Sequence, residues 1–331
     1  MSGSSTRRDE PADTEISLVI ATGREYGCER LVRAVERQLQ AVGHTAYEII
    51  LVLDGCPPYR WLDPADRRIT AIVLPERVGI ARARTVGVRA ARGQLLAFLD
   101  DDCVPAEMWL TELLRLSREH PTSVAFGGRV IGTAPRNLYS QLRDAVYYYE
   151  TFGPWYTDSS ATTDVLGAPY VNGGNSAYRR EALLSAGGFD ELLPAYSDVE
   201  LGRRMNLAER AVLSPGMAIH HDHPSDFRQY QLRCWRSGRA RALLWAHRGY
   251  RQDRPRAVLR TIVINLVWAN AARRRPRIAA PPLYVVAVLT CQEVVHGAGY
   301  IYALVGSVAR RRIARRSAAH TSGRGMAADT P

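Results

Sequence analysis

The chain has 331 residues, of which 46% are hydrophobic and 23% are charged, an ordinary globular composition with ample apolar material for a core. This length predicts one large domain or one domain with an appendage. The net charge is +11, every basic residue is Arg, and from Arg248 to the end fifteen Arg stand against three acidic residues. Such a basic segment indicates an anionic partner, either phospholipid head groups or nucleic acid.

The five cysteines are scattered and form no Cys-x-x-Cys pair, so neither a disulfide framework nor a cysteine-based structural zinc site is indicated. Residues 1–15 contain no apolar segment of the kind that a secretory signal needs, and we expect a short disordered leader there. Both features favour a reducing, cytoplasmic location.

Four apolar runs in the first hundred residues predict buried strands, and two segments between them have helical spacing. The runs are continuous, which is typical of strands covered on both faces of a mainly parallel sheet. The strands are expected at 16–21, 48–53, 69–75 and 95–99, and the helices at 28–43 and 79–93. This alternation predicts a doubly wound α/β domain.

The following segments continue the pattern as far as residue 250. A helix is expected at 107–120 and a strand at 123–130, and the Tyr-, Trp-, Gly- and Ser-rich stretch 137–170 is expected to form a long segment on the substrate side. Further helices are expected at 180–188, 198–210 and 227–250.

An apolar segment at 281–309 is long enough to cross a bilayer, but Glu293 and His296 lie near its middle. Arg clusters flank it on both sides. We favour a membrane-associated interfacial or re-entrant helix, with a true span and a helix packed on the domain as alternatives. The expected organisation is a leader at 1–15, a catalytic domain at 16–225, a helical appendage at 226–309 and a basic disordered tail at 310–331.

Acidic side chains follow two of the predicted strands. Asp54 comes directly after the second strand, and Asp100, Asp101 and Asp102 come directly after the fourth. Ligands of doubly wound sheets bind beyond the carboxyl ends of the strands, so both features fall on the ligand-binding edge. Carboxylates there suit Mg²⁺ or Mn²⁺, which in turn hold a diphosphate. An acidic triplet alone is also typical of a solvated turn or a helix N-cap.

A second group of polar residues lies in VNGGNSAYRREALLSAGGFDELLPAYSDVELGRRM, residues 171–205, which combines two Gly-Gly turns with Asp198. Asp198 is expected near a helix start, where the positive end of the helix dipole stabilises a carboxylate. An ionised Asp198 can accept a proton from an attacking hydroxyl. The alternative is a helix N-cap, and the two roles are compatible.

Five segments, in this order, resemble the family 2 glycosyltransferases with the GT-A fold, over residues 16 to about 240. They are ISLVIATGRE, EIILVLDGC, GIARARTVGVRAARGQLLAFLDDDCVP, VNGGNSAYRREALLSAGGFDE with SDVELGRRM, and HHDHP with CWRSGRA. The resemblance implies an inverting, metal-dependent transfer of a hexose or deoxyhexose from a nucleotide diphosphate sugar, UDP- or dTDP-linked, to an acceptor hydroxyl. The transition state would resemble an oxocarbenium ion.

The resemblance also implies contacts to the nucleotide-sugar donor. Thr22 lies in the nucleotide loop, and Asp54 would accept a hydrogen bond from the ring N–H of uracil or thymine. Arg84 would contact the nucleotide or its phosphates. Asp101 holds the middle position of the acidic triplet, within the donor site.

The metal and catalytic residues follow from the same resemblance. Asp100 and Asp102 form the DxD pair that holds Mn²⁺ or Mg²⁺, with Asp102 as the direct ligand and Asp100 closer to the ribose. His221, or its neighbour His223, would approach the metal and diphosphate from the far side. Asp198 would be the catalytic base.

Several positions depart from the family pattern, so the donor is left unassigned. The first loop reads Ala21-Thr22-Gly23-Arg24 instead of the usual Pro-Thr-Tyr-Asn. Leu53 holds the first of two usual aspartates, and Thr85 replaces a common Asn.

Four alternatives to this interpretation fit the sequence less well. Zinc at HHDHP would need further Cys or His ligands, and QLRCWRSG differs in spacing from the signature of processive polysaccharide synthases. A nucleotidyltransferase would need a Gly-rich basic loop, which ATGREYG matches poorly. Nucleic-acid binding would use the Arg and aromatic residues of 227–251, but their apolar members have the helical spacing of a core.

The basic and apolar C-terminal part also bears on partners. We expect an anionic membrane surface and a lipid-linked or lipophilic acceptor, and no nucleic acid. The expected location is the cytoplasmic, inner face of the cell membrane.

Overall fold

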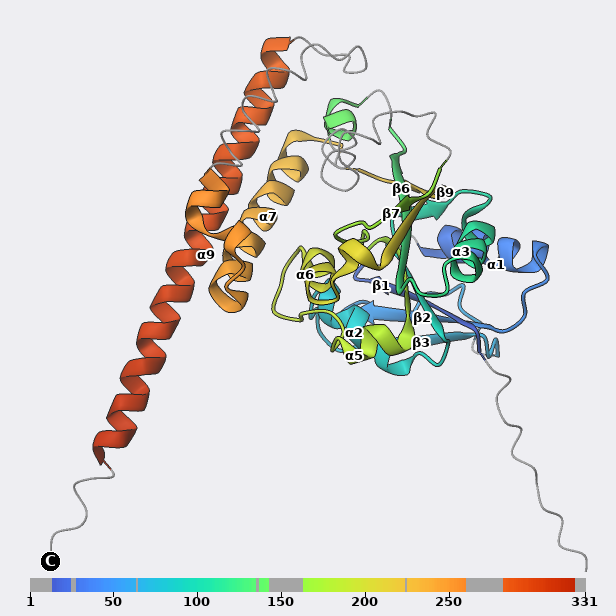
Figure 1. The fold of residues 1–331 in the computed structure, drawn as a ribbon, viewed down its shortest axis with the longest axis horizontal. Coiled ribbons are helices and arrows are strands. Elements are labelled where there is room, and N and C mark those ends of the chain that lie inside the picture. The colour runs from blue at the N-terminus through green and yellow to red at the C-terminus, as the bar shows by residue number, and fades with distance from the viewer. Residues whose placement is uncertain are drawn as a thin grey trace, which may run out of the picture. The chain divides into compact units, whose positions relative to one another are not determined.

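The computed structural model describes residues 14–24, 28–63, 65–134, 137–142, 163–223, 225–259 and 282–324, with side chains of the last helix described over 284–307. The chain divides into two compact units (Figure 1). One comprises the residues up to Thr133, Arg143–Leu192 and Ser197–His223, and the other comprises Ala134–Leu142, Leu193–Tyr196 and Pro224–Pro331. The expected leader, apart from its last two residues, and most of 137–170 lie outside the described residues.

Four parallel strands form one half of a nine-stranded sheet in the first unit, in the order β3-β2-β1-β4. They are β1 (Ile16–Thr22), β2 (Tyr47–Asp54), β3 (Ile69–Leu74) and β4 (Leu95–Leu99), connected in part by α1 (Cys28–Ala41) and α2 (Ile80–Ala90). Every residue of β1, β2 and β4 is buried, whereas β3 forms the sheet edge and is partly exposed. The predicted strand–helix alternation is confirmed, and the edge position of β3 explains its weaker apolar run.

The other half of the sheet is mixed, whereas the sequence predicted a mainly parallel sheet. β8 (Asn175–Arg179) lies antiparallel to β4 and to β6 (Ala125–Gly132), and β9 (Ala211–His221) lies parallel to β6. β5 (Cys103–Pro105) and β7 (Val165–Leu166) pair antiparallel with β9. Of these strands, only β6 was expected. Because β8 pairs antiparallel with β4, a segment from the second half of the chain lies beside the parallel strands.

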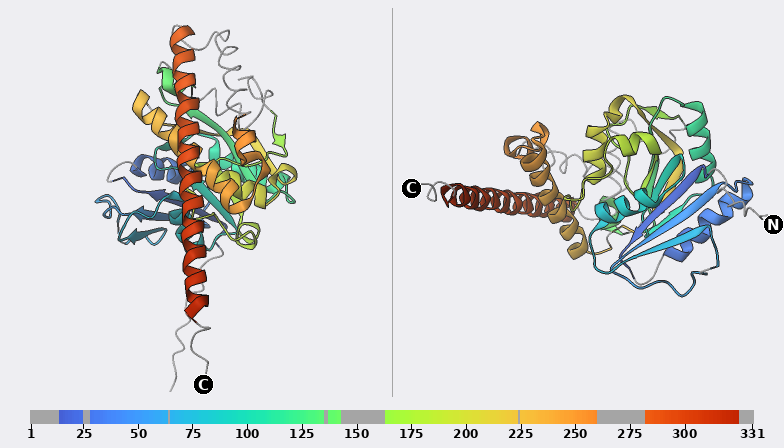
Figure 2. Two further views of the ribbon diagram at one scale, coloured as in Figure 1. Left: turned by 90° about the vertical axis from the view of Figure 1, so that its left-hand side faces the viewer. Right: turned by 90° about the horizontal axis from the view of Figure 1, so that it is seen from below.

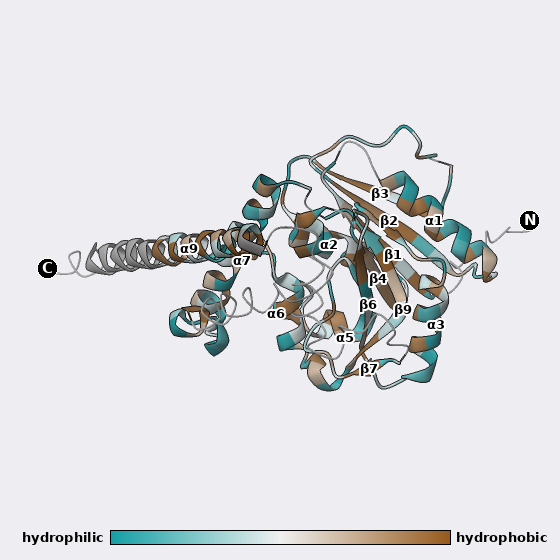
Figure 3. Cartoon of the chain, turned by 90° about the horizontal axis from the view of Figure 1, so that it is seen from above, coloured by the Kyte–Doolittle hydropathy of each residue, from teal (hydrophilic) through white to brown (hydrophobic). Residues whose placement is uncertain are grey.

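Helices cover both faces of this sheet. α1 and α3 (Trp109–Glu119) lie on one face, and α2, α5 (Arg180–Ser185) and α6 (Ser197–Arg204) lie on the other (Figure 3). The short helix η2 (Leu207–Glu209) leads into β9. Apolar strands fill the space between the two helical layers, so that the carboxyl ends of β1, β2 and β4 meet at one edge of a rigid core.

The second unit consists mainly of α7 (Phe227–Arg248), the short η3 (Arg251–Asp253) and α9 (Pro282–Arg324), a continuous helix (Figure 2). α7 and α9 pack closely at two glycines. A Cβ on Gly238 would lie 2.0 Å from the carbonyl oxygen of His296. A Cβ on Gly299 would likewise lie 2.5 Å from the carbonyl oxygen of Trp235. Among the described residues, no helix is long and apolar enough to cross a membrane.

Candidate active site

Asp54 ends β2 and holds the start of α2. Its Oδ1 accepts a hydrogen bond from Val78 N at 2.6 Å, and its Oδ2 accepts one from Gly79 N at 2.9 Å. The side chain is 6% exposed. Asp54 therefore lies on the predicted edge, and the visible contacts give it a role in fixing the turn before α2. Contact with a pyrimidine base stays a prediction.

Arg84 and Asp100 form an ion pair at the end of β4, with 2.5 Å between Arg84 Nη2 and Asp100 Oδ1. Arg84 is buried, and its guanidinium lies 5.7 Å from the centre of the Phe189 ring. Arg84 comes from α2 and Phe189 from the second Gly-Gly segment. The contact between Arg84 and Phe189 therefore joins α2 to the segment 171–205, which also carries Asp198.

The Gly173-Gly174 turn lies against this ion pair. A Cβ on Gly173 would lie 2.4 Å from Arg84 Nη1, and one on Gly174 would lie 2.3 Å from Asp100 Oδ2. A side chain at either position would displace Arg84 or Asp100, so the observed close approach of the turn to the ion pair favours glycine. The Gly-Gly signal in the sequence thus has a direct steric cause.

Asp198 lies in the first turn of α6 and binds the same turn. Its Oδ2 accepts a hydrogen bond from Gly173 N at 3.0 Å, and its Oδ1 accepts one from Val199 N at 2.9 Å. The backbone N–H of Gly173 therefore contacts Asp198, and the Cα of the same residue lies against the Arg84 side chain. The structure brings Asp198, Arg84 and Asp100 together, although about a hundred residues separate Asp198 from the other two in the sequence.

Asp101 and Asp102 meet residues of the first loop. Thr22 Oγ1 donates to Asp101 Oδ2 at 2.6 Å, and Arg24 Nη2 donates to Asp102 Oδ2 at 2.6 Å. Arg24 Nε also lies 3.5 Å from Asp101 Oδ1. Burial is the main cause of the raised pKa of Asp101, and the hydrogen bond from Thr22 opposes it. Sequence reasoning missed Arg24, although its departure from the family's usual Asn was a signal.

Tyr59 is a further residue that the sequence did not indicate. Its hydroxyl donates to the carbonyl oxygen of Arg24 at 2.7 Å and lies 3.1 Å from Thr22 Oγ1. Tyr59 therefore fixes the loop that carries both residues. No local pattern singles it out, because its role depends on a partner 35 positions away in the chain.

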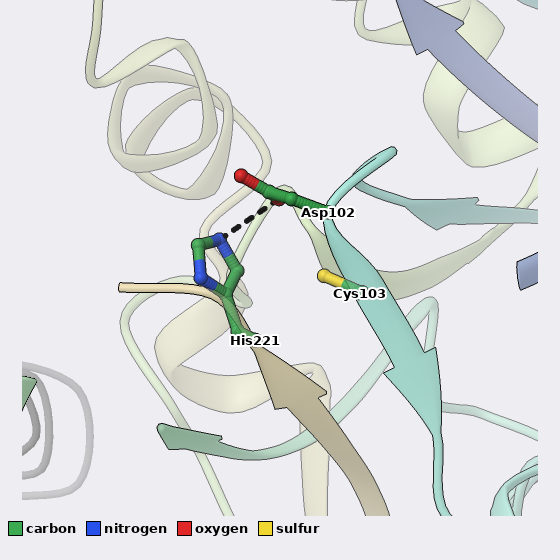
Figure 4. Close-up of side chains that lie close together, drawn as sticks. All are labelled: Asp102, Cys103 and His221. Atoms are coloured by element: carbon green, nitrogen blue, oxygen red, sulfur yellow. Dashed lines mark ion pairs between the residues drawn. The ribbon is translucent and has the colours of Figure 1, made fainter. Parts of the chain in front are cut away.

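His221 faces Asp102 across the β5–β9 pair (Figure 4), with 3.2 Å between His221 Nε2 and Asp102 Oδ1. Asp222 N donates to the carbonyl oxygen of Asp102 at 3.1 Å and fixes this approach. The ring of His223 lies 4.9 Å from that of His221. Of the two histidines that the resemblance allowed, His221 contacts Asp102 directly, and the role of either histidine at a metal stays a prediction.

One carboxylate and one imidazole, from Asp102 and His221, fit a divalent cation such as Mn²⁺, which accepts oxygen and nitrogen ligands. Cys103 belongs to the same cluster, whose ligand atoms lie within 4.8 Å of one another. The sequence did not foresee a cysteine beside HHDHP. Burial raises the pKa of the Cys103 thiol well above its usual range. Asp100, the other residue of the expected DxD pair, forms the ion pair with Arg84, and its role as a metal ligand stays a prediction.

Comparison with known proteins identifies the class. The family model described as Glycosyl transferase family 2 matches residues 17–185, slightly more than half of the chain. The chain belongs to the family 2 glycosyltransferases. The resemblance that the sequence motifs carried is thereby confirmed, and the mixed α/β sheet with C-terminal helices is that of the GT-A fold.

Two curated relatives show how similar the chain is to individual proteins. Over 229 residues the chain is 28% identical to the Pre-mycofactocin glycosyltransferase of Mycobacterium tuberculosis, covering 66% of this chain and 45% of that protein. Over 185 residues it is 24% identical to the Glucosyl-dolichyl phosphate glucuronosyltransferase of Haloferax volcanii, covering 53% and 56%. The chain thus spans about half the length of the curated relatives it matches.

A solved structure similar to this chain is the mannosyltransferase PcManGT from Pyrobaculum calidifontis in complex with GDP-Man and Mn²⁺. It is 19% identical, with a TM-score of 0.49, and the match covers 96% of this chain and 81% of that one.

Proposed function

We propose that the chain transfers a sugar from a nucleotide diphosphate sugar to an acceptor hydroxyl with inversion. The observation that carries this proposal is the contact of the Gly173-Gly174 turn with Asp198 on one side and the Arg84–Asp100 pair on the other. A candidate base and candidate donor-binding groups thereby share one edge of the sheet. This arrangement supports inversion, in which a base beside the donor site takes the proton of an acceptor that attacks opposite the leaving diphosphate.

Donor binding is assigned to the edge formed by β1, β2 and β4. Arg84 offers a planar guanidinium suited to phosphate or ribose oxygens, and Asp102 with His221 would hold Mn²⁺ or Mg²⁺. A cation there supplies charge stabilisation for the departing diphosphate. Asp54 retains acceptor capacity, because a carboxylate can accept about four hydrogen bonds and two are in use. Asp54 could therefore accept a hydrogen bond from the ring N–H of uracil or thymine, and we assign a UDP- or dTDP-linked hexose or deoxyhexose as the donor, as the family resemblance implies.

Asp198 is assigned as the base that accepts the acceptor's proton. Hydrogen bonds from Gly173 N and Val199 N fix both of its oxygens and thus hold the side chain in one orientation. As the acceptor oxygen bonds to the anomeric carbon, its proton passes to Asp198 and the bond to the diphosphate breaks.

We assign the acceptor to the membrane surface because α9 exposes large apolar side chains. Its exposed large apolar side chains are Tyr284, Val294, Ile301, Tyr302 and Val305. The ionisable Glu293 and His296 are instead buried. α9 also buries the apolar Val285, Val288 and Tyr300, so it carries apolar residues on both its buried and its exposed sides.

Arg clusters at 273–277 and 310–316 flank this apolar face in the sequence. An apolar helical face with basic flanks is typical of a helix lying at an anionic membrane surface. The name of the Haloferax volcanii relative includes a dolichyl phosphate, a lipid carrier. We therefore assign the chain to the cytoplasmic face of the cell membrane and its acceptor to lipid-linked or lipophilic molecules.

A panel of nucleotide sugars tests the donor assignment. Each would be mixed with the full chain and Mn²⁺, and thermal stabilisation and donor hydrolysis would be measured. The proposal predicts that a UDP- or dTDP-sugar stabilises and is hydrolysed only when Mn²⁺ or Mg²⁺ is present. Stabilisation by Zn²⁺ alone, with no response to any nucleotide sugar, would contradict it and would favour a structural zinc site at Asp102, Cys103 and His221.

A further inference from the structure

The loop after β1 places a cation of the protein itself on the acidic triplet. Arg24 donates from Nη2 to Asp102 Oδ2 at 2.6 Å, while the other oxygen of that carboxylate, Oδ1, lies 3.2 Å from His221. The side chain of Arg24 is 54% exposed, whereas that of Asp102 is 13% exposed. Arg24 therefore covers the largely buried carboxylate from the solvent side, which is the side from which an ion would enter.

The backbone of Arg24 is fixed, although its side chain is half exposed. Its N–H donates to Thr22 Oγ1 at 3.2 Å, and its carbonyl oxygen accepts from Tyr59. Thr22 in turn donates to Asp101. The guanidinium can therefore leave Asp102 by side-chain rotation alone, while the loop stays in place.

A divalent cation and the Arg24 guanidinium would compete for the Asp102 carboxylate. A cation shared by Asp102 and His221 would draw on the same carboxylate charge that Arg24 neutralises, and two adjacent positive groups repel each other. Ion entry therefore weakens or breaks the pair between Arg24 and Asp102. The reverse also holds, because equilibrium coupling between two bound groups is reciprocal.

We infer that Arg24 is an internal counter-ion that competes with the divalent cation for Asp102 and thereby lowers the metal affinity of the empty site. This inference rests on the proposed metal-dependent function and adds a residue that sets when the cation binds. Without the cation Arg24 neutralises part of the charge of the acidic triplet, and it is released when the cation binds.

The test is a titration of the full chain with Mn²⁺ in the absence of nucleotide. The affinity for Mn²⁺ is measured by calorimetry and, independently, by the electron paramagnetic resonance signal of free Mn²⁺. Arg24→Gln removes the competing charge and should bind Mn²⁺ about tenfold more tightly than the unchanged protein, as expected for loss of one charged hydrogen bond. Arg24→Lys keeps the charge and should give an affinity near that of the unchanged protein.

Arg82→Gln is the matched control, because it removes one exposed Arg whose partner is Glu191 and not the acidic triplet. Its Mn²⁺ affinity should not change. Circular dichroism melts of all variants establish folding, and Arg24→Ala repeats the measurement if Arg24→Gln does not fold.

Equal or weaker Mn²⁺ binding by Arg24→Gln, with binding still abolished by Asp102→Asn, would overturn the inference and leave the proposed function intact. Absence of any Asp102-dependent Mn²⁺ binding in all variants, with UDP as well as without it, would overturn both.

Discussion

The environment of Arg84 restricts its replacement. It is buried, pairs with Asp100 and packs against both the Phe189 ring and the Gly173 backbone. Burial of a guanidinium is unfavourable unless its hydrogen bonds are made, so the surrounding groups hold the side chain in one position. A rigid planar donor of this kind suits the paired oxygens of a phosphate or ribose.

Arg84→Lys should lower the affinity for the donor nucleotide about tenfold, because an ammonium keeps the charge but loses the second N–H contact. Calorimetric titration with UDP and Mn²⁺ measures this directly. Arg89→Lys is the control, since it makes the same change at an exposed position of the same helix. Equal effects from the two variants would show that Arg84 acts only through the general charge of α2.

At the scale of elements, α6 is held in place by a buried ion pair. Glu200 is fully buried and lies 2.5 Å from Arg204 Nη2, and the guanidinium also donates to the carbonyl oxygens of Ala186 and Gly188. The helix that carries Asp198 is thereby tied to the turn that follows α5. The position of the candidate base depends on this pair.

Arg204→Leu should destabilise the fold by about 3 kcal/mol, because it removes the ion pair that Arg204 makes with the buried Glu200 carboxylate. Arg203→Leu removes the neighbouring, partly exposed Arg and should have a much smaller effect. Denaturant unfolding of both variants measures the difference. A similar loss for the two would mean that Glu200 finds another partner and that α6 does not depend on the pair.

The exposed face of α9 gives a second prediction at this scale. Val294→Glu combined with Ile301→Glu should reduce binding to vesicles of phosphatidylglycerol and phosphatidylcholine by at least about tenfold, because two apolar side chains are lost from the contact. Co-sedimentation measures the bound fraction. The control combines Val42→Glu with Val73→Glu, which places the same charge on exposed valines of the first unit. Equal loss in both would indicate a general charge effect instead of a membrane-binding face.

At the scale of the whole molecule, local sequence predicted the elements whose signals are local. The runs at β1, β2 and β4 are continuously apolar because both faces are covered, and Asp54 and Asp100–Asp102 follow them at the predicted edge. Parallel strands bring their carboxyl ends together, so this half of the site follows from order and polarity alone.

The remaining features depend on contacts between distant segments. The sequence did not predict β8, because NSAYR is largely polar. The buried side chain of Asn175 forms hydrogen bonds with Trp109, Arg129 and Met217, which lie far away in the sequence. The same is true of Arg24, whose role appears only when the first loop meets Asp101 and Asp102. Propensity and periodicity do not encode such pairings.

Asp198→Asn tests the central claim that two distant segments form one transfer site. In the presence of Mn²⁺ and the donor selected by the panel, donor binding should stay within about twofold of that of the unchanged protein, because Asn keeps the shape and a hydrogen-bond acceptor. Turnover should fall about a thousandfold, because the amide cannot take a proton. Asp226→Asn is the control, since Asp226 caps α7 through a comparable hydrogen bond from Gln229 N.

Donor binding and turnover, measured side by side for these two variants, therefore distinguish catalysis from helix capping. Selective loss of turnover in Asp198→Asn, with Asp226→Asn unaffected, is the result we predict. Parallel loss of binding and turnover in Asp198→Asn, or unchanged turnover, would contradict the account.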